Sequence, residues 1–183
     1  MRIIAGEFGS RRIEAPAGMS TRPTLDKVRE AVFSALGGSF EGGDMLDLYA
    51  GSGANGLEAL SRGMDRAVFV DNDRRAVSAI RKNIASLNVK NRTEILSCTD
   101  LKALSILKEE GRKFALIYMD PPYAKQKNNE ILSLISEYGL LEAGGMAVIE
   151  SLKEDEFHDE FEHLQFEKDR VYGISRITYY RGK

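Results

Sequence analysis

The chain has 183 residues, of which 43% are hydrophobic and 30% are charged, and its net charge is −2. These values fit one globular domain with a sizeable core and exclude a general polyanion binder. No apolar run approaches the roughly 20 residues that span a bilayer, which excludes a membrane helix. The single cysteine, Cys98, excludes an internal disulfide and favours the cytoplasm. No cluster of cysteine and histidine has metal-ligand spacing, so no metal site is predicted.

The charge is distributed unevenly along the chain. Residues 1–40 contain six basic and four acidic residues, a net charge of +2, which leaves −4 for the other 143 residues. We therefore expect any contact with nucleic acid to be local and N-terminal.

The N-terminal section shows no regular alternation of strands and helices. Residues 2–14 form two short extended pieces around Gly9 and Ser10, a pattern that predicts a β-hairpin. Thr24 is the predicted N-cap of a helix that ends at Gly37. The section is predicted to be a small extension of the main fold.

From residue 45 onward, apolar runs alternate with helix-like segments. The predicted strands are Met45–Ala50, Ala67–Val70, Glu94–Ser97, Phe114–Met119 and Met146–Ile149. The predicted helices lie near residues 55–62, 74–87, 100–110 and 128–141. Such alternation predicts an α/β fold with a parallel sheet and helices on both faces.

The C-terminal part breaks this alternation. Two extended runs, Leu164–Asp169 and Ile174–Arg181, are separated by a short turn and predict an antiparallel hairpin at the sheet edge. Because no linker or repeat interrupts the pattern, residues 1–183 are predicted to form one domain, with an N-terminal extension at 1–40 and a catalytic core at 41–183.

A glycine-rich turn follows the first predicted strand. Asp47 lies in that strand, and Gly51, Gly53 and Gly56 follow with G-x-G-x-x-G spacing around Ser52. Glycines at this spacing permit a tight turn and let a ligand approach the backbone. The pattern favours a nucleotide-like ligand, and tight packing without a ligand is the alternative.

Acidic residues follow the next two predicted strands. Asp71 stands twenty residues after Gly51 and is followed by Asn72, at a place where an acid receives ribose hydroxyl groups. The alternative role for Asp71 is to cap the next helix, which Asp73 suits better. Asp100 suits equally a contact with an adenine amino group or a helix N-cap. These features fit either a dinucleotide or S-adenosyl-L-methionine.

The tetrapeptide Asp120, Pro121, Pro122 and Tyr123 follows the predicted strand that ends at Met119. Prolines cannot donate to a sheet ladder, so they end the strand at the edge where open α/β sheets bind ligands. The Asp120 carboxylate and the Pro121 carbonyl can accept both hydrogens of an exocyclic amine, and Tyr123 can stack on a planar base. Hydride transfer needs no such group, so the tetrapeptide favours methyl transfer from S-adenosyl-L-methionine over a simple strand-ending turn.

Taken together, these segments resemble the RsmD-type family of bacterial methyltransferases, which modify the N2 amine of a guanine in 16S rRNA. The segments that carry the resemblance are Arg2–Gly6, Thr21–Thr24, Lys27–Ala31, Asp47–Gly63 and Asp120–Tyr123. The resemblance implies a Rossmann-like class I methyltransferase fold, whose seven-stranded, mainly parallel sheet ends in an antiparallel hairpin. It also implies that 16S rRNA or the small ribosomal subunit is the partner. The cofactor residues that it and the motifs together predict are Asp47, Gly51, Ser52, Gly53, Gly56, Asp71, Asn72 and Asp100.

Five N-terminal arginines are predicted to hold RNA phosphates or to orient the target loop: Arg2, Arg11, Arg12, Arg22 and Arg29. A solvated surface is the alternative for all five. Two other functions stay open. A DNA adenine-N6 methyltransferase shares the tetrapeptide but usually carries a target-recognition domain. A catalytically silent RNA-binding or ribosome-assembly module would keep the cofactor fold. The absence of a heptad repeat favours a monomer.

Overall fold

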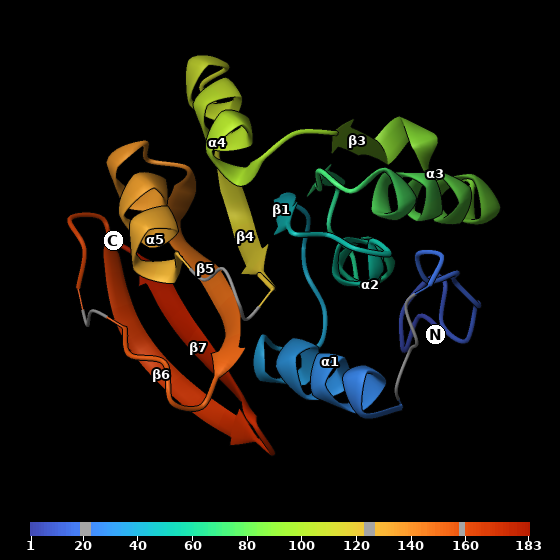
Figure 1. The fold of residues 1–183 in the computed structure, drawn as a ribbon, viewed down its shortest axis with the longest axis horizontal. Coiled ribbons are helices and arrows are strands. Elements are labelled where there is room, and N and C mark those ends of the chain that lie inside the picture. Colours follow the sequence, from blue (N-terminus) through green and yellow to red (C-terminus); the bar gives the residue numbers. More distant parts are fainter. Residues whose placement is uncertain (19–22, 123–126, 158–159) are drawn as a thin grey trace.

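The computed structural model describes residues 1–18, 23–122, 127–157 and 160–183, with the backbone alone at 23–25 (Figure 1). The predicted RNA contact at Arg22 and the predicted stacking residue Tyr123 lie outside the described residues.

A seven-stranded sheet has the order β3-β2-β1-β4-β5-β7-β6. The strands are β1 (Asp44–Leu48), β2 (Arg66–Val70), β3 (Thr93–Leu96), β4 (Phe114–Met119), β5 (Leu141–Leu152), β6 (Leu164–Tyr172) and β7 (Ser175–Gly182). The helices are α1 (Pro23–Ala35), α2 (Ala54–Ser61), α3 (Arg74–Leu87), α4 (Asp100–Glu109) and α5 (Asn128–Glu137), with a 3₁₀ turn at Lys90–Arg92. Strands β1 to β5 are parallel, and β7 pairs antiparallel with both β5 and β6. The predicted fold class is confirmed.

The sheet separates two hydrophobic clusters, because successive side chains of a strand point to opposite faces. Met45 and Tyr118 pack on one face with residues of α1, α2 and α3. Leu46 and Ile117 pack on the other face with residues of α4 and α5. Because side chains alternate between the two faces, the position of a residue in its strand decides whether its side chain lies on the same face as the glycine turn.

The N-terminal section contributes to the first of these clusters. Ile3, Phe8 and Ile13 are buried there beside α2 and α3. The predicted hairpin forms only in part: one antiparallel bridge joins Arg2 and Arg12, without regular strands within residues 1–18. Its apolar side chains fix the segment by packing, so a continuous ladder is not required.

Several predicted boundaries differ from the structure, most of them by one to three residues. Helix α1 begins at Pro23, so Thr24 lies inside the helix and is not its N-cap, in keeping with the preference of proline for the first helical position. Helix α5 ends at Glu137 because Gly139, at φ 61°, turns the chain out of the helix. Strand β5 runs from Leu141 to Leu152 and therefore includes Glu150, beyond the predicted end at Ile149.

Candidate active site

The carboxyl ends of β1 and β4 meet at the centre of the sheet. These strands are parallel neighbours, and the Asp120 backbone N–H reaches the Leu48 carbonyl at 3.4 Å. The glycine turn after β1 and residues Asp120–Pro122 after β4 therefore open onto the same edge. A cavity of about 160 Å³ lies there, lined by Met1, Ala15, Pro16, Val28, Arg29, Tyr49, Ala50, Gly51, Ser52, Ala54, Asn55, Tyr118, Asp120 and Glu150.

The three glycines of the motif have different physical roles. Gly51 has φ +58°, and a Cβ added there would meet no atom within 4 Å, so this turn leaves room for a ligand. Gly53, at φ +79°, stands at the N-cap of α2. A Cβ at Gly56 would lie 2.3 Å from Cε1 of Phe69, so this glycine is required for α2 to pack on β2. The packing alternative thus applies to Gly56, whereas the space beside Gly51 stays open.

Asp47 is fully buried at the end of β1. Its Oδ2 accepts a hydrogen bond from the Gly56 N–H at 2.9 Å, while Oδ1 has no hydrogen-bond partner among the described residues. Burial raises the pKa of this carboxyl to about 8; the charge of Asp71 adds to the rise, and the Gly56 hydrogen bond opposes it. The free Oδ1 is a buried acceptor that a positively charged ligand group would satisfy.

Asp71 joins the end of β2 to the glycine turn. Its Oδ2 accepts from the Gly51 N–H at 2.9 Å, and its Oδ1 accepts from the Asp73 N–H at 2.9 Å. Asp73 caps α3 by accepting from the Arg75 N–H at 2.8 Å, as predicted, so Asp71 does not serve as the helix cap. Asn72 is exposed beside it.

Asp100 faces the glycine turn. Its Oδ2 accepts a hydrogen bond from the Tyr49 hydroxyl at 2.7 Å. The N-cap of α4 is Thr99, whose hydroxyl accepts from the Lys102 N–H at 3.4 Å, so the capping alternative for Asp100 does not apply. Tyr49 has φ 61°, and burial followed by Asp100 raises the pKa of its hydroxyl. Sequence analysis did not single out Tyr49, because its position depends on a left-handed backbone turn.

A second acid, Glu150, lies beside Asp120. Met119 of β4 pairs with Ile149 of β5, so the next residue of each strand stands at the same level of the sheet. Glu150 is only 7% exposed, whereas Asp120 is open to solvent at the cavity mouth with protein atoms crowded around its other sides. Sequence reasoning missed Glu150, although an acid placed directly after an apolar run on the neighbouring strand was a usable signal.

Several acidic groups lie close together where β4 and β5 approach the cavity. Loss of water contacts to the surrounding protein, and then the charges of Glu150 and Asp47, raise the pKa of the Asp120 carboxyl well above its usual range. Burial likewise raises the pKa of Glu150, against a hydrogen bond from Ser175. Pro121 is buried and Pro122 exposed, so the strand ends at a fixed turn.

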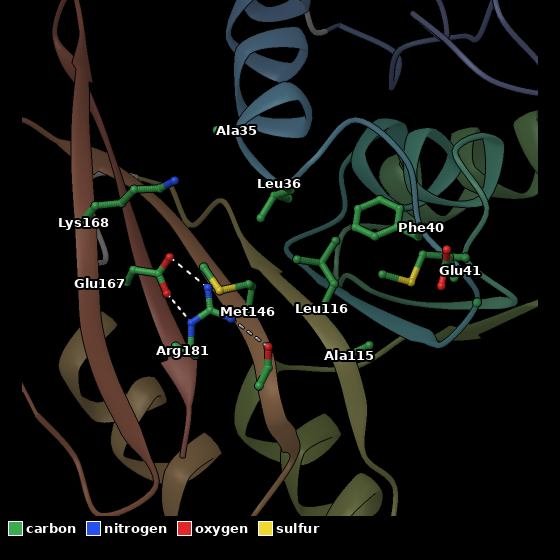
Figure 2. A pocket seen from close by; sticks show the side chains of 13 residues that line it. Ala35, Leu36, Phe40, Glu41, Ala115, Leu116, Met146, Glu167, Lys168 and Arg181 are labelled. Atoms are coloured by element: carbon green, nitrogen blue, oxygen red, sulfur yellow. Dashed lines mark hydrogen bonds and ion pairs between the residues drawn. The ribbon is translucent and has the colours of Figure 1, made fainter.

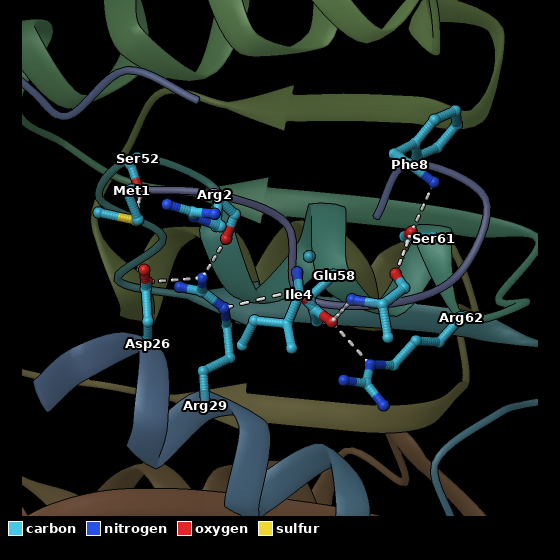
Figure 3. Close-up of polar contacts among 12 residues, drawn as sticks. Met1, Arg2, Ile4, Phe8, Asp26, Arg29, Ser52, Glu58, Ser61 and Arg62 are labelled. Carbon is cyan, nitrogen blue, oxygen red and sulfur yellow. Dashed lines mark hydrogen bonds and ion pairs between the residues drawn. The ribbon is translucent and has the colours of Figure 1, made fainter. Parts of the chain in front are cut away.

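The N-terminal section is held on α2 by one buried carboxylate (Figure 3). Glu58 accepts hydrogen bonds from the backbone N–H groups of Ile4 at 2.8 Å and Ala5 at 3.2 Å. It also pairs with Arg62 at 2.7 Å and with Arg29 at 3.6 Å. Through this contact the section places Met1 at the cavity wall, and it is thus part of the site.

The predicted RNA-contacting arginines are not alike. Arg2, Arg11 and Arg12 are exposed, and Arg11 donates to the Ser86 carbonyl at 2.8 Å. Arg29 is only 4% exposed, and its guanidinium donates to the Arg2 carbonyl at 2.6 Å and to Asp26 at 2.9 Å (Figure 3). Arg29 therefore lies in the cavity wall, away from the surface that RNA phosphates can reach.

A larger cavity of about 450 Å³ lies at the opposite edge, where β4 and β5 begin. Figure 2 shows Arg181 between Glu167 and a backbone carbonyl; it donates to Glu167 at 2.9 Å and to the Gly144 carbonyl at 3.2 Å. The charges of Arg181 and Glu167 are paired with each other. None of the predicted site residues lines this cavity. We therefore take the smaller cavity as the candidate site.

Within the described ranges, no helix is long and apolar enough to cross a membrane. The same ranges contain no group of three or more side chains that could hold a metal ion.

The strand order and the cavity beside the glycine turn define a class I methyltransferase fold. Residues 1–181 match the family described as "Conserved hypothetical protein 95". The chain is 38% identical, over 99% of its length and 98% of the relative, to YlbH of Bacillus subtilis, provisionally named an rRNA methyltransferase. It is 34% identical to "Ribosomal RNA small subunit methyltransferase D" of Escherichia coli K12, over 82% of this chain and 74% of that one. The chain belongs to this family, the RsmD-type rRNA methyltransferases.

Solved structures agree with this placement. The structure of yhhF from Escherichia coli, provisionally described as a methyltransferase, has a TM-score of 0.84 and 29% identity, and covers 100% of this chain and 98% of that one. The Thermus thermophilus 16S rRNA N2 G1207 methyltransferase, in complex with AdoMet and guanosine, has a TM-score of 0.67 at 21% identity, and covers 91% of this chain and 45% of that one. This second likeness concerns the fold alone.

Proposed function

We propose that the protein transfers a methyl group from S-adenosyl-L-methionine to the exocyclic N2 amine of a guanine in 16S rRNA. The observation that carries the proposal is the position of Asp120, which opens into the cavity beside the glycine turn of a chain in the RsmD-type family. The N2 position itself is supported by the resemblance of the tetrapeptide and the N-terminal segments to that family.

The residues around the glycine turn fit the cofactor. The open space at Gly51 suits a ligand against the backbone, and the free Oδ1 of Asp47 suits a positively charged amino group. Asp71 has lone pairs left for ribose hydroxyl groups after its two backbone contacts. Asp100, held by Tyr49, stands where the adenine amino group is proposed. The cofactor supplies a methyl group already activated on a positively charged sulfur.

Asp120 is the proposed catalytic residue. An exocyclic amine is a weak nucleophile because its lone pair is delocalised into the ring. The Asp120 carboxylate and the Pro121 carbonyl accept its hydrogens, which fixes the nitrogen and directs its lone pair toward the methyl carbon. Tyr123 is proposed to stack on the base.

RNA is proposed to approach along the N-terminal section. Arg2, Arg11 and Arg12 present exposed charge there, whereas Arg29 belongs to the cavity wall and is not included. Reversing the charges of Arg11 and Arg12 together is expected to weaken RNA binding and to lower its salt slope by about 2, because about two phosphate contacts are lost. Cofactor affinity should not change. The matched control reverses Lys108 and Lys113, which are exposed at the end of α4 and just after it, on the other face of the sheet.

The central test offers labelled S-adenosyl-L-methionine with small ribosomal subunits, naked 16S rRNA and duplex DNA in parallel. The expected result is label on guanine N2 in the ribosomal substrate, with transfer by Asp120→Ala slower by about 10³-fold. Label on adenine in DNA would overturn the proposal in favour of an adenine-N6 methyltransferase. Tight RNA binding without transfer to any substrate would instead indicate an assembly module.

A further inference from the structure

Two acids lie side by side at the cavity: Asp120, directly after β4, and Glu150, within β5. Met119 and Ile149 are paired in register, and both pack into the cluster with α4 and α5. The following residues, Asp120 and Glu150, therefore leave the sheet toward the opposite face, where both line the cavity. Neighbouring strands lie about 4.8 Å apart, so the two carboxyl groups are within reach of each other.

The two members of the pair have different surroundings. Glu150 is 7% exposed, and its carboxylate accepts a hydrogen bond from Ser175 of β7. Asp120 opens toward the cavity mouth, where substrate and solvent arrive. Two carboxylates at this separation repel each other strongly when both are ionised, which favours retention of one proton. Burial raises the pKa of Glu150, and crowding by the surrounding protein together with the charge of Glu150 raises the pKa of Asp120, which acts in the same direction.

Other titratable and charged side chains line the same cavity or interact electrostatically with residues beside the pair. They are Arg29 of α1, Asp47 of β1, Tyr49 of the glycine turn, Tyr118 of β4 and Tyr179 of β7. Arg29 is already engaged with Asp26 and Glu58, and Met1, which carries the α-amino group, also lines the cavity. Asp47 adds a further negative charge when it is ionised. The charges that act on Asp120 are those of Glu150 and Asp47, and both raise its pKa.

We propose that Glu150 is a positioning residue that shares one proton with Asp120 and thereby sets the protonation of the group that receives the amine proton. The inference rests on the proposed methyl transfer and deepens it. With one proton on the pair, one carboxylate remains to accept the amine hydrogens, and the second charge is suppressed.

The proton balance of the reaction follows from this arrangement. As the amine nitrogen forms its bond to the methyl carbon, the carbon–sulfur bond breaks and its electron pair stays on sulfur. The nitrogen then carries a positive charge and one proton in excess. That proton passes to Asp120, so the pair changes from one proton to two, and one proton leaves through the open cavity mouth to solvent.

The first test follows the carboxyl groups directly and needs no RNA. Carbon-13 carboxyl NMR of the folded protein, labelled at aspartate and glutamate, is expected to show Asp120 and Glu150 titrating in two coupled steps, with one proton retained at pH 7. In Glu150→Gln, which keeps the acceptor for Ser175, Asp120 should titrate in one step, below the upper step of the wild-type pair. Independent titration of both groups near pH 4 would overturn the pairing.

The second test follows the single-turnover rate against pH with saturating cofactor and RNA. The wild-type rate should fall on both sides of a maximum, because the singly protonated pair is the active form. Glu150→Gln should lose about tenfold in rate at the maximum with unchanged KM for RNA, and its decline at high pH should disappear. The matched control is Glu142→Gln, at the other end of β5, which should keep the wild-type profile.

A Glu150→Gln profile that superimposes on the wild-type profile after scaling would overturn the proposal, since a merely structural role lowers the rate equally at every pH. The two tests also separate two kinds of failure. Coupled carboxyl titration without methylation of any RNA would leave the pair intact and reject the proposed function. Methylation of rRNA with independent titrations would reject the pair alone.

Discussion

The carboxyl edge of the sheet has two halves with opposite polar character. In the first half, Asp47 near the end of β1 and Asp71 directly after β2 accept hydrogen bonds from backbone N–H groups of the glycine turn and of α2. Asp120, directly after β4, and Glu150, within β5, line the same cavity, and the charge of Glu150 helps to raise the pKa of Asp120. Binding a cofactor requires a turn that is already in place, whereas assisting a reaction requires a group whose charge state can change. Under the proposed function one sheet edge would serve both roles, and like charges act in both halves, since Asp71 also raises the pKa of Asp47.

The largest expected effect separates the two halves by function. Asp120→Ala should lower the single-turnover rate by about 10³-fold while changing cofactor affinity less than about twofold, because the group acts on the amine. Asp71→Ala should do the opposite and weaken cofactor binding by about tenfold or more. Calorimetry with S-adenosylhomocysteine and a rapid-quench assay measure both. Near-normal turnover in Asp120→Ala would remove the distinction between the halves.

The next effect sharpens the contrast inside the cofactor half. Gly56→Ala should destabilise the fold by about 1–3 kcal/mol, because the new Cβ would lie 2.3 Å from the Phe69 ring. Gly51→Ala meets open space and pays only for its left-handed backbone, about 1 kcal/mol, but should weaken cofactor binding more. Urea unfolding and calorimetry of the two variants give the comparison. Equal losses of stability would contradict the assignment of packing to Gly56 alone.

A third prediction concerns the pH dependence of stability. The pKa of Asp47 is about 8 in the folded protein and lies near 4 when unfolded, so the folded state holds a proton that the unfolded chain releases. Its contribution is present below pH 4 and is lost as the pH rises toward 8. Asp47→Asn should therefore be more stable than wild type by about 1–3 kcal/mol at pH 9, with a much smaller difference at pH 4. Urea titrations at both pH values test this, and a difference independent of pH would refute it.

The smallest effect tests the neighbouring acids of β2. Asp73→Ala removes the cap of α3 and should cost about 1 kcal/mol, with cofactor affinity unchanged. The exposed pair with Arg75 adds little to this value. Thermal unfolding gives the loss. If cofactor affinity fell instead, Asp73 rather than Asp71 would be the ribose-binding acid.

Local pattern was sufficient for much of the fold. The alternation of short apolar runs with helical segments predicted β1 to β5 in sequence, and the bounds of α3 and β4 agree with the structure to the residue. Both depend on local features: Asp73 caps α3, and two prolines end β4. The Gly56 and Asp120 motifs were recognisable for the same reason, because their residues are contiguous in the chain.

Contacts between segments that are distant in the sequence could be found only from the tertiary structure. The burial of Arg29 depends on Glu58, which lies 29 residues further along the chain, so its positive charge alone suggested a surface contact. The pairing of Asp120 with Glu150 depends on the register of β4 with β5, which crosses the intervening helix α5. The sequence by itself determined where each strand and turn chemistry occurs, since these follow from neighbouring residues. Strand order and register then decided which functional side chains share a face of the sheet and which charged groups lie next to each other.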